Sequence, residues 1–171
     1  MKLIGSGLYQ HLIERAIRVA RGEPAQDWRP ELKLDVSGRI PEAYIPEEEA
    51  RLNLYARLAR AAADESITRL GEEIEDRFGP MPDELATLLR LARLKKLAFR
   101  LGIVRLDAGP QAIAVTFRNG AGEPAGVGAA VAAGAGTLEW RGERLVAAWP
   151  SETPEERQRL AAELLGRLER G

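Results

Sequence analysis

The stretch at residues 82–101 restricts the fold of this chain most strongly, because its apolar residues cover too wide a surface for a helix at the edge of a protein. Pro82 suits the first turn of a helix, where its missing N–H is not needed. Leucine or phenylalanine then stands at positions 85, 88, 89, 91, 94, 97 and 99. A helix that buries one face needs an apolar stripe of only about 100°. The sequence therefore predicts a central helix that packs on more than one side.

Further helices are predicted on the N-terminal side of this central helix. Their apolar side chains recur with helical spacing over residues 8–21, 47–61 and 64–78. Ser6 and Gly22 suit the two ends of the first of them. Residues 23–30 are a proline-bracketed connector, and residues 31–36 alternate apolar with charged side chains. That alternation predicts a half-buried strand between the first two helices.

The C-terminal third of the chain has the pattern of strands and one last helix. Two hairpins are predicted, from residues 103–109 with 111–118 and from residues 137–140 with 144–149. The glycine- and alanine-rich residues 121–136 fit either a small-residue helix or a loop. Ser151 is the expected cap of a terminal helix, and residues 153–156 are its start signal. The predicted class is α+β, with several helices packed with a small antiparallel sheet built from hairpins.

The sequence contains no recognisable catalytic constellation. His11 is the only histidine, and between apolar helix neighbours it fits packing better than metal or proton chemistry. No cysteine and no phosphate-binding glycine motif occur, so no cofactor or metal is predicted. Acids at 47–49 and 72–76 lack the glycine-containing loop of a cation site, and fit a solvated face. The net charge is −1, and no apolar run is long enough to span a membrane, so neither nucleic acid nor membrane is favoured as a partner.

The end of the helix at residues 64–78 carries an unfavourable set of charges. Acids crowd its last turns at Glu72, Glu73, Glu75 and Asp76. They oppose the helix dipole, which is negative at the C-terminus, and Glu72 repels Asp76 at the i,i+4 spacing. Glu73 can pair with Arg77 at the same spacing. Each effect is only about 0.2–0.5 kcal/mol, so a solvated face and a surface that meets a positive partner both remain open.

Several motifs occur in an order that resembles the C-terminal domain of bacterial transcription-repair coupling factors. They are Ile4-Gly5 with Leu8-Tyr9, the segment YIPEEEARLNLYARL from Tyr44 to Leu58, the turn DRFGPMP from Asp76 to Pro82, and Leu101-Gly102-Ile103. The resemblance is strong over residues 4–106 and weaker beyond. Residues 121–136 depart from the bulkier helix that is usual in this family.

The resemblance implies that residues 1–171 form a single C-terminal regulatory domain of a larger protein, with residues 1–3 expected to derive from cloning. In such proteins an ATP-dependent DNA translocase motor precedes this domain, and its motifs are absent here, so no enzyme activity is expected of this chain. The family assigns an autoinhibitory role to the domain. It packs on the UvrB-like N-terminal module of the same protein and masks the surface that recruits UvrA in nucleotide excision repair. The expected location is the cytoplasm, with RNA polymerase and DNA contacted only through the parent protein.

The resemblance also indicates where the interdomain contact lies. Acids at the positions of Glu73 and Asp76 meet arginines of the UvrB-like module in this family, with Arg77 and Phe78 nearby. A second function class remains open, in which the domain is an accessory nucleic-acid-binding element that helps the translocase. The basic residues that would serve it are Arg90, Arg93, Lys95, Lys96, Arg100 and Arg105. They surround the central helix at mixed angles, which fits a solvated flank better than a phosphate-tracking stripe.

Overall fold

The computed structural model describes residues 28–118, 127–133 and 137–170. The chain divides into two compact units, one formed by Met1–Trp28 with Ile40–Pro82 and the other by Arg29–Arg39 with Asp83–Gly171. The helix predicted at residues 8–21, its expected ends Ser6 and Gly22, and His11 lie outside the described residues.

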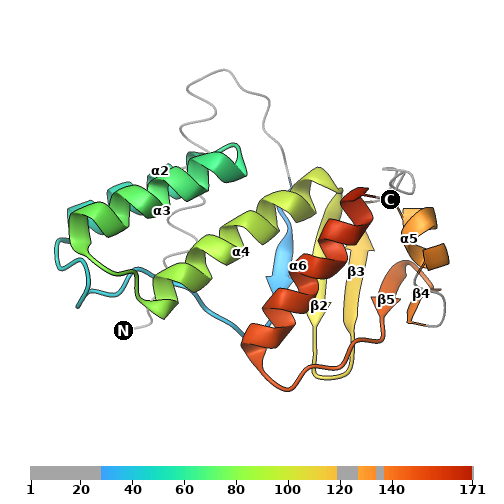
Figure 1. Cartoon of the computed structure of the whole chain (residues 1–171). Coiled ribbons are helices and arrows are strands. Elements are labelled where there is room, and N and C mark those ends of the chain that lie inside the picture. Colours follow the sequence, from blue (N-terminus) through green and yellow to red (C-terminus); the bar gives the residue numbers. More distant parts are fainter. Residues whose placement is uncertain (1–27, 119–126, 134–136, 171) are drawn as a thin grey trace, which may run out of the picture. The chain divides into compact units, whose positions relative to one another are not determined.

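The described part of the first unit contains two helices, α2 (Glu48–Arg60) and α3 (Asp64–Phe78), which lie side by side (Figure 1). Glu48 and Glu49 occupy the first turn of α2, where their negative charge interacts favourably with the positive end of the helix dipole. The apolar stripe of α3 is buried as predicted, with Ile67, Leu70 and Ile74 each at most 5% exposed. The helix ends at Gly79, whose φ of +93° is accessible to glycine at little cost.

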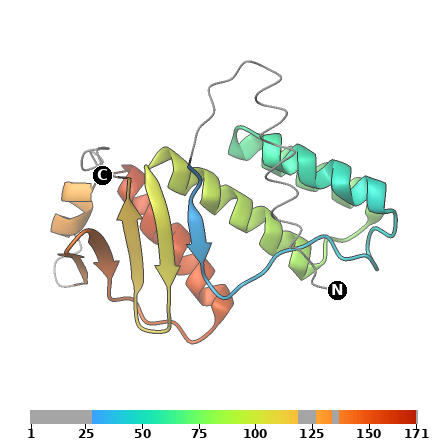
Figure 2. The same ribbon diagram turned by 180° about the vertical axis from the view of Figure 1, so that it is seen from behind.

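The second unit is a five-stranded sheet with helices on one face. Its elements are β1 (Glu31–Lys33), α4 (Asp83–Arg100), β2 (Ile103–Ala108), β3 (Ile113–Phe117), α5 (Val127–Ala133), β4 (Leu138–Arg141), β5 (Arg144–Ala147) and α6 (Pro154–Arg170). The strand order is β1-β2-β3-β5-β4, in which β1 pairs parallel to β2 and all other neighbours are antiparallel. Helices α4 and α6 cover one face of the sheet, and the view from behind shows the other face without a described helix over it (Figure 2). The α+β class is confirmed.

The core of this unit lies between the sheet and its helices. The fully buried side chains include Leu106 on β2, Val115 on β3, Leu145 on β5 and Leu165 on α6. The central helix is also confirmed, because α4 packs against α6 and β2 and has a third neighbour in the segment around Gly38. A Cβ atom built on Gly38 would lie 2.3 Å from the Cα atom of Leu88. Only glycine can therefore pass this close to the helix.

One predicted strand is present but shorter than expected, and one predicted helix cap is wrong. The strand predicted at residues 31–36 ends after Lys33, because Asp35 adopts a left-handed φ of +54° that no strand can contain. Leu34 is still buried, which explains the alternating pattern. Ser151 does not cap the terminal helix. The Oγ1 atom of Thr153 accepts the N–H of Glu156 at 3.1 Å, as an N-cap does, whereas Ser151 is buried and donates to the carbonyl of Gly109 at 3.3 Å.

Both hairpins are present, with one rearrangement. The second hairpin joins the first through β5, so the strand order is not the chain order. The turn of this hairpin places Gly142 at φ +63°. Within residues 121–136 the described part, α5, is helical, in line with one of the two alternatives left open by the sequence.

Candidate interaction site

The C-terminal turn of α3 is held in place by the segment that precedes α2. Tyr44 donates a hydrogen bond from its hydroxyl to the carbonyl of Gly79, with an O···O distance of 2.6 Å. Its ring also lies against Phe78, at 6.1 Å between centroids and an angle of 58°. Arg51 donates to the carbonyls of Ile45 at 2.8 Å and Pro46 at 2.7 Å, which fixes the loop that carries Tyr44. The tyrosine, proline and arginine of the sequence motif therefore build the scaffold of this turn.

Glu73 does not pair with Arg77, as its spacing suggested, but with Arg57 of the neighbouring helix α2. Both terminal nitrogens of Arg57 bind its carboxylate, Nη1 to Oε1 at 2.7 Å and Nη2 to Oε2 at 2.5 Å. This two-bond geometry is the strong form of an arginine–carboxylate contact. The hydrogen bonds from Arg57 lower the pKa of Glu73 below its ordinary value, and the charges of Arg57 and Arg77 act in the same direction.

Arg77 and Phe78 form a stacked pair beside this contact. The guanidinium carbon of Arg77 lies 4.9 Å from the centroid of the Phe78 ring, a cation–π arrangement. Because Phe78 also contacts Tyr44, the stack is anchored to the scaffold of the turn. All four residues predicted for the site lie on the last turns of α3. Arg77 stacks on Phe78 and its charge also acts on Glu73.

The remaining acids of the turn are exposed and have different surroundings. Glu75 accepts the backbone N–H of Met81 at 3.1 Å, and its charge adds to burial in raising the pKa of Tyr44. Within the described part of the chain, Glu72 and Asp76 are exposed and make no hydrogen bond or ion pair through their side chains. Glu73 and Asp76 were predicted to act together, yet the structure makes them unequal. Glu73 already has a cationic partner, whereas Asp76 has none among the residues that the structure describes.

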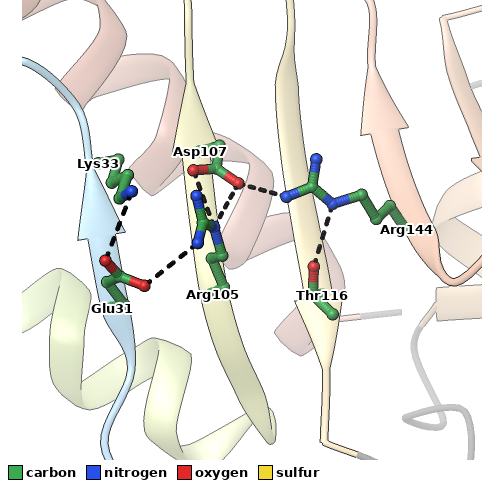
Figure 3. Close-up of polar contacts among 6 residues, drawn as sticks. All are labelled: Glu31, Lys33, Arg105, Asp107, Thr116 and Arg144. Carbon is green, nitrogen blue, oxygen red and sulfur yellow. Dashed lines mark hydrogen bonds and ion pairs between the residues drawn. The ribbon is translucent and has the colours of Figure 1, made fainter.

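A second group of charged residues lies on the face of the sheet opposite α4 and α6 (Figure 3). Asp107 binds two arginines from different strands, Arg105 through Nε at 2.8 Å and Arg144 through Nη2 at 2.5 Å. Arg105 also reaches Glu31 of β1 at 3.4 Å, and Glu31 pairs with Lys33 at 3.6 Å. The register explains the grouping, because Glu31, Arg105, Thr116 and Arg144 lie opposite one another across four strands.

These contacts change the interpretation of Arg105, which was counted with the solvated flank of α4. Its guanidinium is held by the carboxylates of Asp107 and Glu31. The hydrogen bond from Arg105 and the nearby charge of Arg144 lower the pKa of Asp107, so this acid stays ionised at neutral pH. A phosphate that approached this face would have to displace carboxylates already in place. The arrangement therefore removes Arg105 from the cations that the nucleic-acid alternative could use.

Sequence reasoning missed Arg57 and the charged group on the sheet for the same physical reason. Arg57 and Glu73 are 16 positions apart, and Arg144 and Asp107 are 37 apart. Such pairs depend on which helix faces or strands meet, and spacing along the chain carries no signal of that. Within the described ranges, no group of three or more His, Cys, Asp or Glu side chains is arranged to hold a metal ion. None of the described helices combines the length and apolar character needed to cross a bilayer.

Comparison with known proteins gives a consistent result. The model of the TRCF domain family matches residues 34–125. Transcription-repair-coupling factors from Rickettsia bellii and Escherichia coli are each 32% identical to this chain, over 67% and 68% of its length. That of Helicobacter pylori strain 26695 is 36% identical over 68% of the chain. The matches take in only 10–12% of those relatives, so the chain spans about a tenth of their length.

The fold comparison agrees with the sequence comparison. A crystal structure of the C-terminal domain of transcription-repair coupling factor superposes with a TM-score of 0.68 and 20% identity, covering 84% of this chain and 95% of that structure. At this identity the likeness establishes the fold only. The family model covers more than half of the chain, and the motifs around Tyr44 and Gly79 fall within it. This chain therefore belongs to the TRCF domain family, the domain found in bacterial transcription-repair coupling factors.

Proposed function

We propose that this chain is a non-catalytic regulatory domain that restrains its parent transcription-repair coupling factor. It does so by packing on the UvrB-like N-terminal module of the same protein and covering the surface that UvrA would bind. In this proposal the two compact units together form one regulatory domain. The translocase activity and the contacts with RNA polymerase and DNA belong to the remainder of the parent protein, which works in the cytoplasm.

The observation that carries this proposal is the turn at the end of α3, whose conformation is fixed by contacts with the chain before α2. Its scaffold of Tyr44, Arg51 and Phe78 holds the backbone by hydrogen bonds and ring contacts that a merely solvated helix end does not need. On this scaffold Asp76 is exposed and has no ion-pair partner within residues 28–118, 127–133 and 137–170, and its charge opposes the dipole at this end of the helix. A positive group from a partner would relieve that cost. The arginines of the UvrB-like module supply such groups.

Calorimetric titration of this chain with the isolated UvrB-like module of its parent protein tests the proposal, with UvrA added as a competitor. We expect mutually exclusive binding of the chain and UvrA. The double variant Glu73→Ala/Asp76→Ala should bind at least tenfold more weakly, because truncating one partner of a charged interface pair costs about 2–5 kcal/mol when the pair is desolvated.

A matched control keeps the change in net charge constant. Glu143 and Glu155 are exposed acids of the second unit, and their double alanine variant should bind as the wild type does. Simultaneous binding of UvrA and this chain to the module would contradict the masking role. If the folded chain does not bind the separate module, the same variants are compared in the intact parent, where the linker supplies an effective concentration of about millimolar. UvrA recruitment that is unchanged by the acidic double variant there would rule the contact out.

A further inference from the structure

The contact between Arg57 and Glu73 affects how this chain would bind the UvrB-like module. This inference rests on the proposed function. Both carboxylate oxygens of Glu73 are bound by Arg57, at 2.7 Å and 2.5 Å. A cation that a partner brings to Glu73 therefore meets an acid that is already neutralised. It must either replace Arg57 or share the carboxylate with it.

The exposure of the pair favours replacement. The side chains of Arg57 and Glu73 are 40% and 50% exposed, so each can return to water when the contact breaks. The two-bond geometry makes this a strong arginine–carboxylate contact, but its exposure lowers the cost of breaking it, because solvent screens the charges and both side chains regain freedom. A partner cation can therefore replace Arg57 at Glu73.

Asp76 lies three residues further along the same helix, and no cation of the described part of the chain binds its carboxylate. Residues at this spacing are neighbours on the helix surface, about 5–6 Å apart at Cβ. Arg77, the nearest basic residue in the sequence, stacks on Phe78 instead of pairing with Asp76. A partner cation at Asp76 forms a new ion pair, whereas one at Glu73 exchanges one ion pair for another.

We infer that Arg57 is an internal competitor for Glu73, which weakens the binding of the partner module and leaves Asp76 as the main electrostatic anchor. By weakening this binding, Arg57 makes dissociation of the domain from the UvrB-like module easier. The alternative role for Arg57 is positioning, in which it presents Glu73 to the partner and strengthens binding. Replacing Arg57 should strengthen binding of the partner module if Arg57 competes, and weaken it if Arg57 positions Glu73.

The experiment measures the affinity of single variants of this chain for the isolated UvrB-like module. Arg57→Met keeps much of the apolar stem and removes the guanidinium, so competition predicts about two- to fivefold tighter binding. Asp76→Asn should weaken binding more than Glu73→Gln does. Weaker binding of Arg57→Met would overturn the inference in favour of positioning, and unchanged affinity would overturn it as well.

Two controls separate competition from a general charge effect. Arg60→Met removes a positive charge from the same last turn of α2, where Arg60 donates to the carbonyl of Ala56 in its own helix. An equal gain in affinity for Arg60→Met would overturn the inference. In addition, the gain from Arg57→Met should vanish in a Glu73→Gln background, because a double-mutant cycle isolates effects that act through one partner.

A readout without the partner checks the geometry. The pKa of Glu73 should rise toward its ordinary value in Arg57→Met, as measured by NMR titration of the carboxyl carbon, because the first cause of its lowered pKa is the hydrogen bonding of Arg57. Failure of the proposed function looks different from failure of this inference. The former leaves binding insensitive to both Asp76→Asn and Glu73→Gln, or absent in the wild type. The latter keeps that sensitivity without a gain from Arg57→Met.

Discussion

At the scale of single residues, Tyr44 connects the chain before α2 to the end of α3. Tyr44→Phe keeps the ring on Phe78 but leaves the Gly79 carbonyl without its donor. We expect a loss of about 1 kcal/mol in the free energy of unfolding, measured by urea denaturation. Leu52→Ala is the control, since Leu52 is 48% exposed, and it should change stability by less than about 0.5 kcal/mol. An unchanged urea midpoint for Tyr44→Phe would show that the hydrogen bond contributes nothing.

Tyr44 also predicts a dependence of stability on alkaline pH. Burial, and then the charge of Glu75, raise the pKa of its hydroxyl above 10.0 in the folded chain. A raised pKa means that the folded state holds the proton more tightly. Its contribution is therefore complete below pH 10 and is lost as pH rises through the folded pKa. Urea midpoints across this range should fall more for the wild type than for Tyr44→Phe, and parallel curves would contradict the assignment.

Asp107 is the central acid of the sheet face, and its effect should appear at the opposite end of the pH scale. The hydrogen bond from Arg105 and the charges of Arg105 and Arg144 lower its pKa below 3.8. Its contribution is then present above pH 3.8 and lost as pH falls through the folded pKa. Asp107→Asn should cost about 1 kcal/mol at pH 7 and progressively less in acid. A cost that is equal at pH 7 and pH 3 would mean that charge is not its origin.

At the scale of elements, two glycines of the second unit should respond to alanine in opposite directions. The Cβ atom of Gly38→Ala would lie 2.3 Å from both the Cα and N atoms of Leu88, and this backbone cannot yield without moving α4. The expected loss is about 3 kcal/mol. Gly166→Ala on α6 meets only the flexible end of Arg170 at 3.7 Å, so helix propensity should make it more stable by about 0.5–1 kcal/mol. Thermal unfolding of both variants tests whether the melting temperature falls for Gly38→Ala and rises for Gly166→Ala. Equal changes in the two melting temperatures would contradict the close approach of Gly38 to α4.

The elements that sequence reasoning predicted well are those whose signal is local. The apolar stripe of α3 and the wide apolar surface of α4 reflect helical spacing within one element, and their ends carry glycine or proline. The errors occurred where one residue overrides a pattern, as Asp35 does in the strand at residues 31–36. The partner of Glu73 was also mispredicted, because the sequence shows Arg77 at the right spacing but cannot show that α2 presents Arg57 beside it. Pairing between elements is a property of packing.

At the scale of the whole molecule, charge balance separates the two function classes considered for this chain. Its net charge is −1, and Arg105 and Arg144, on the face of the sheet away from α4 and α6, are held by carboxylates. Counterion release gives a DNA-binding protein its affinity, and it requires cations that are free to meet phosphates. A regulatory domain does not need a net positive charge, because its proposed contact depends on a few acids at the end of α3 that act over a short range.

The corresponding prediction concerns DNA. Fluorescence anisotropy with a labelled duplex should show no binding of the wild-type chain at about 100 mM salt. Asp107→Asn removes the carboxylate shared by Arg105 and Arg144, so this variant should bind DNA at low salt more strongly than the wild type does. Glu143→Gln changes the net charge equally at an exposed turn and should not. Wild-type binding that persists near 100 mM salt and falls steeply as salt rises would instead favour the accessory nucleic-acid class, because such a slope counts phosphates neutralised by free cations.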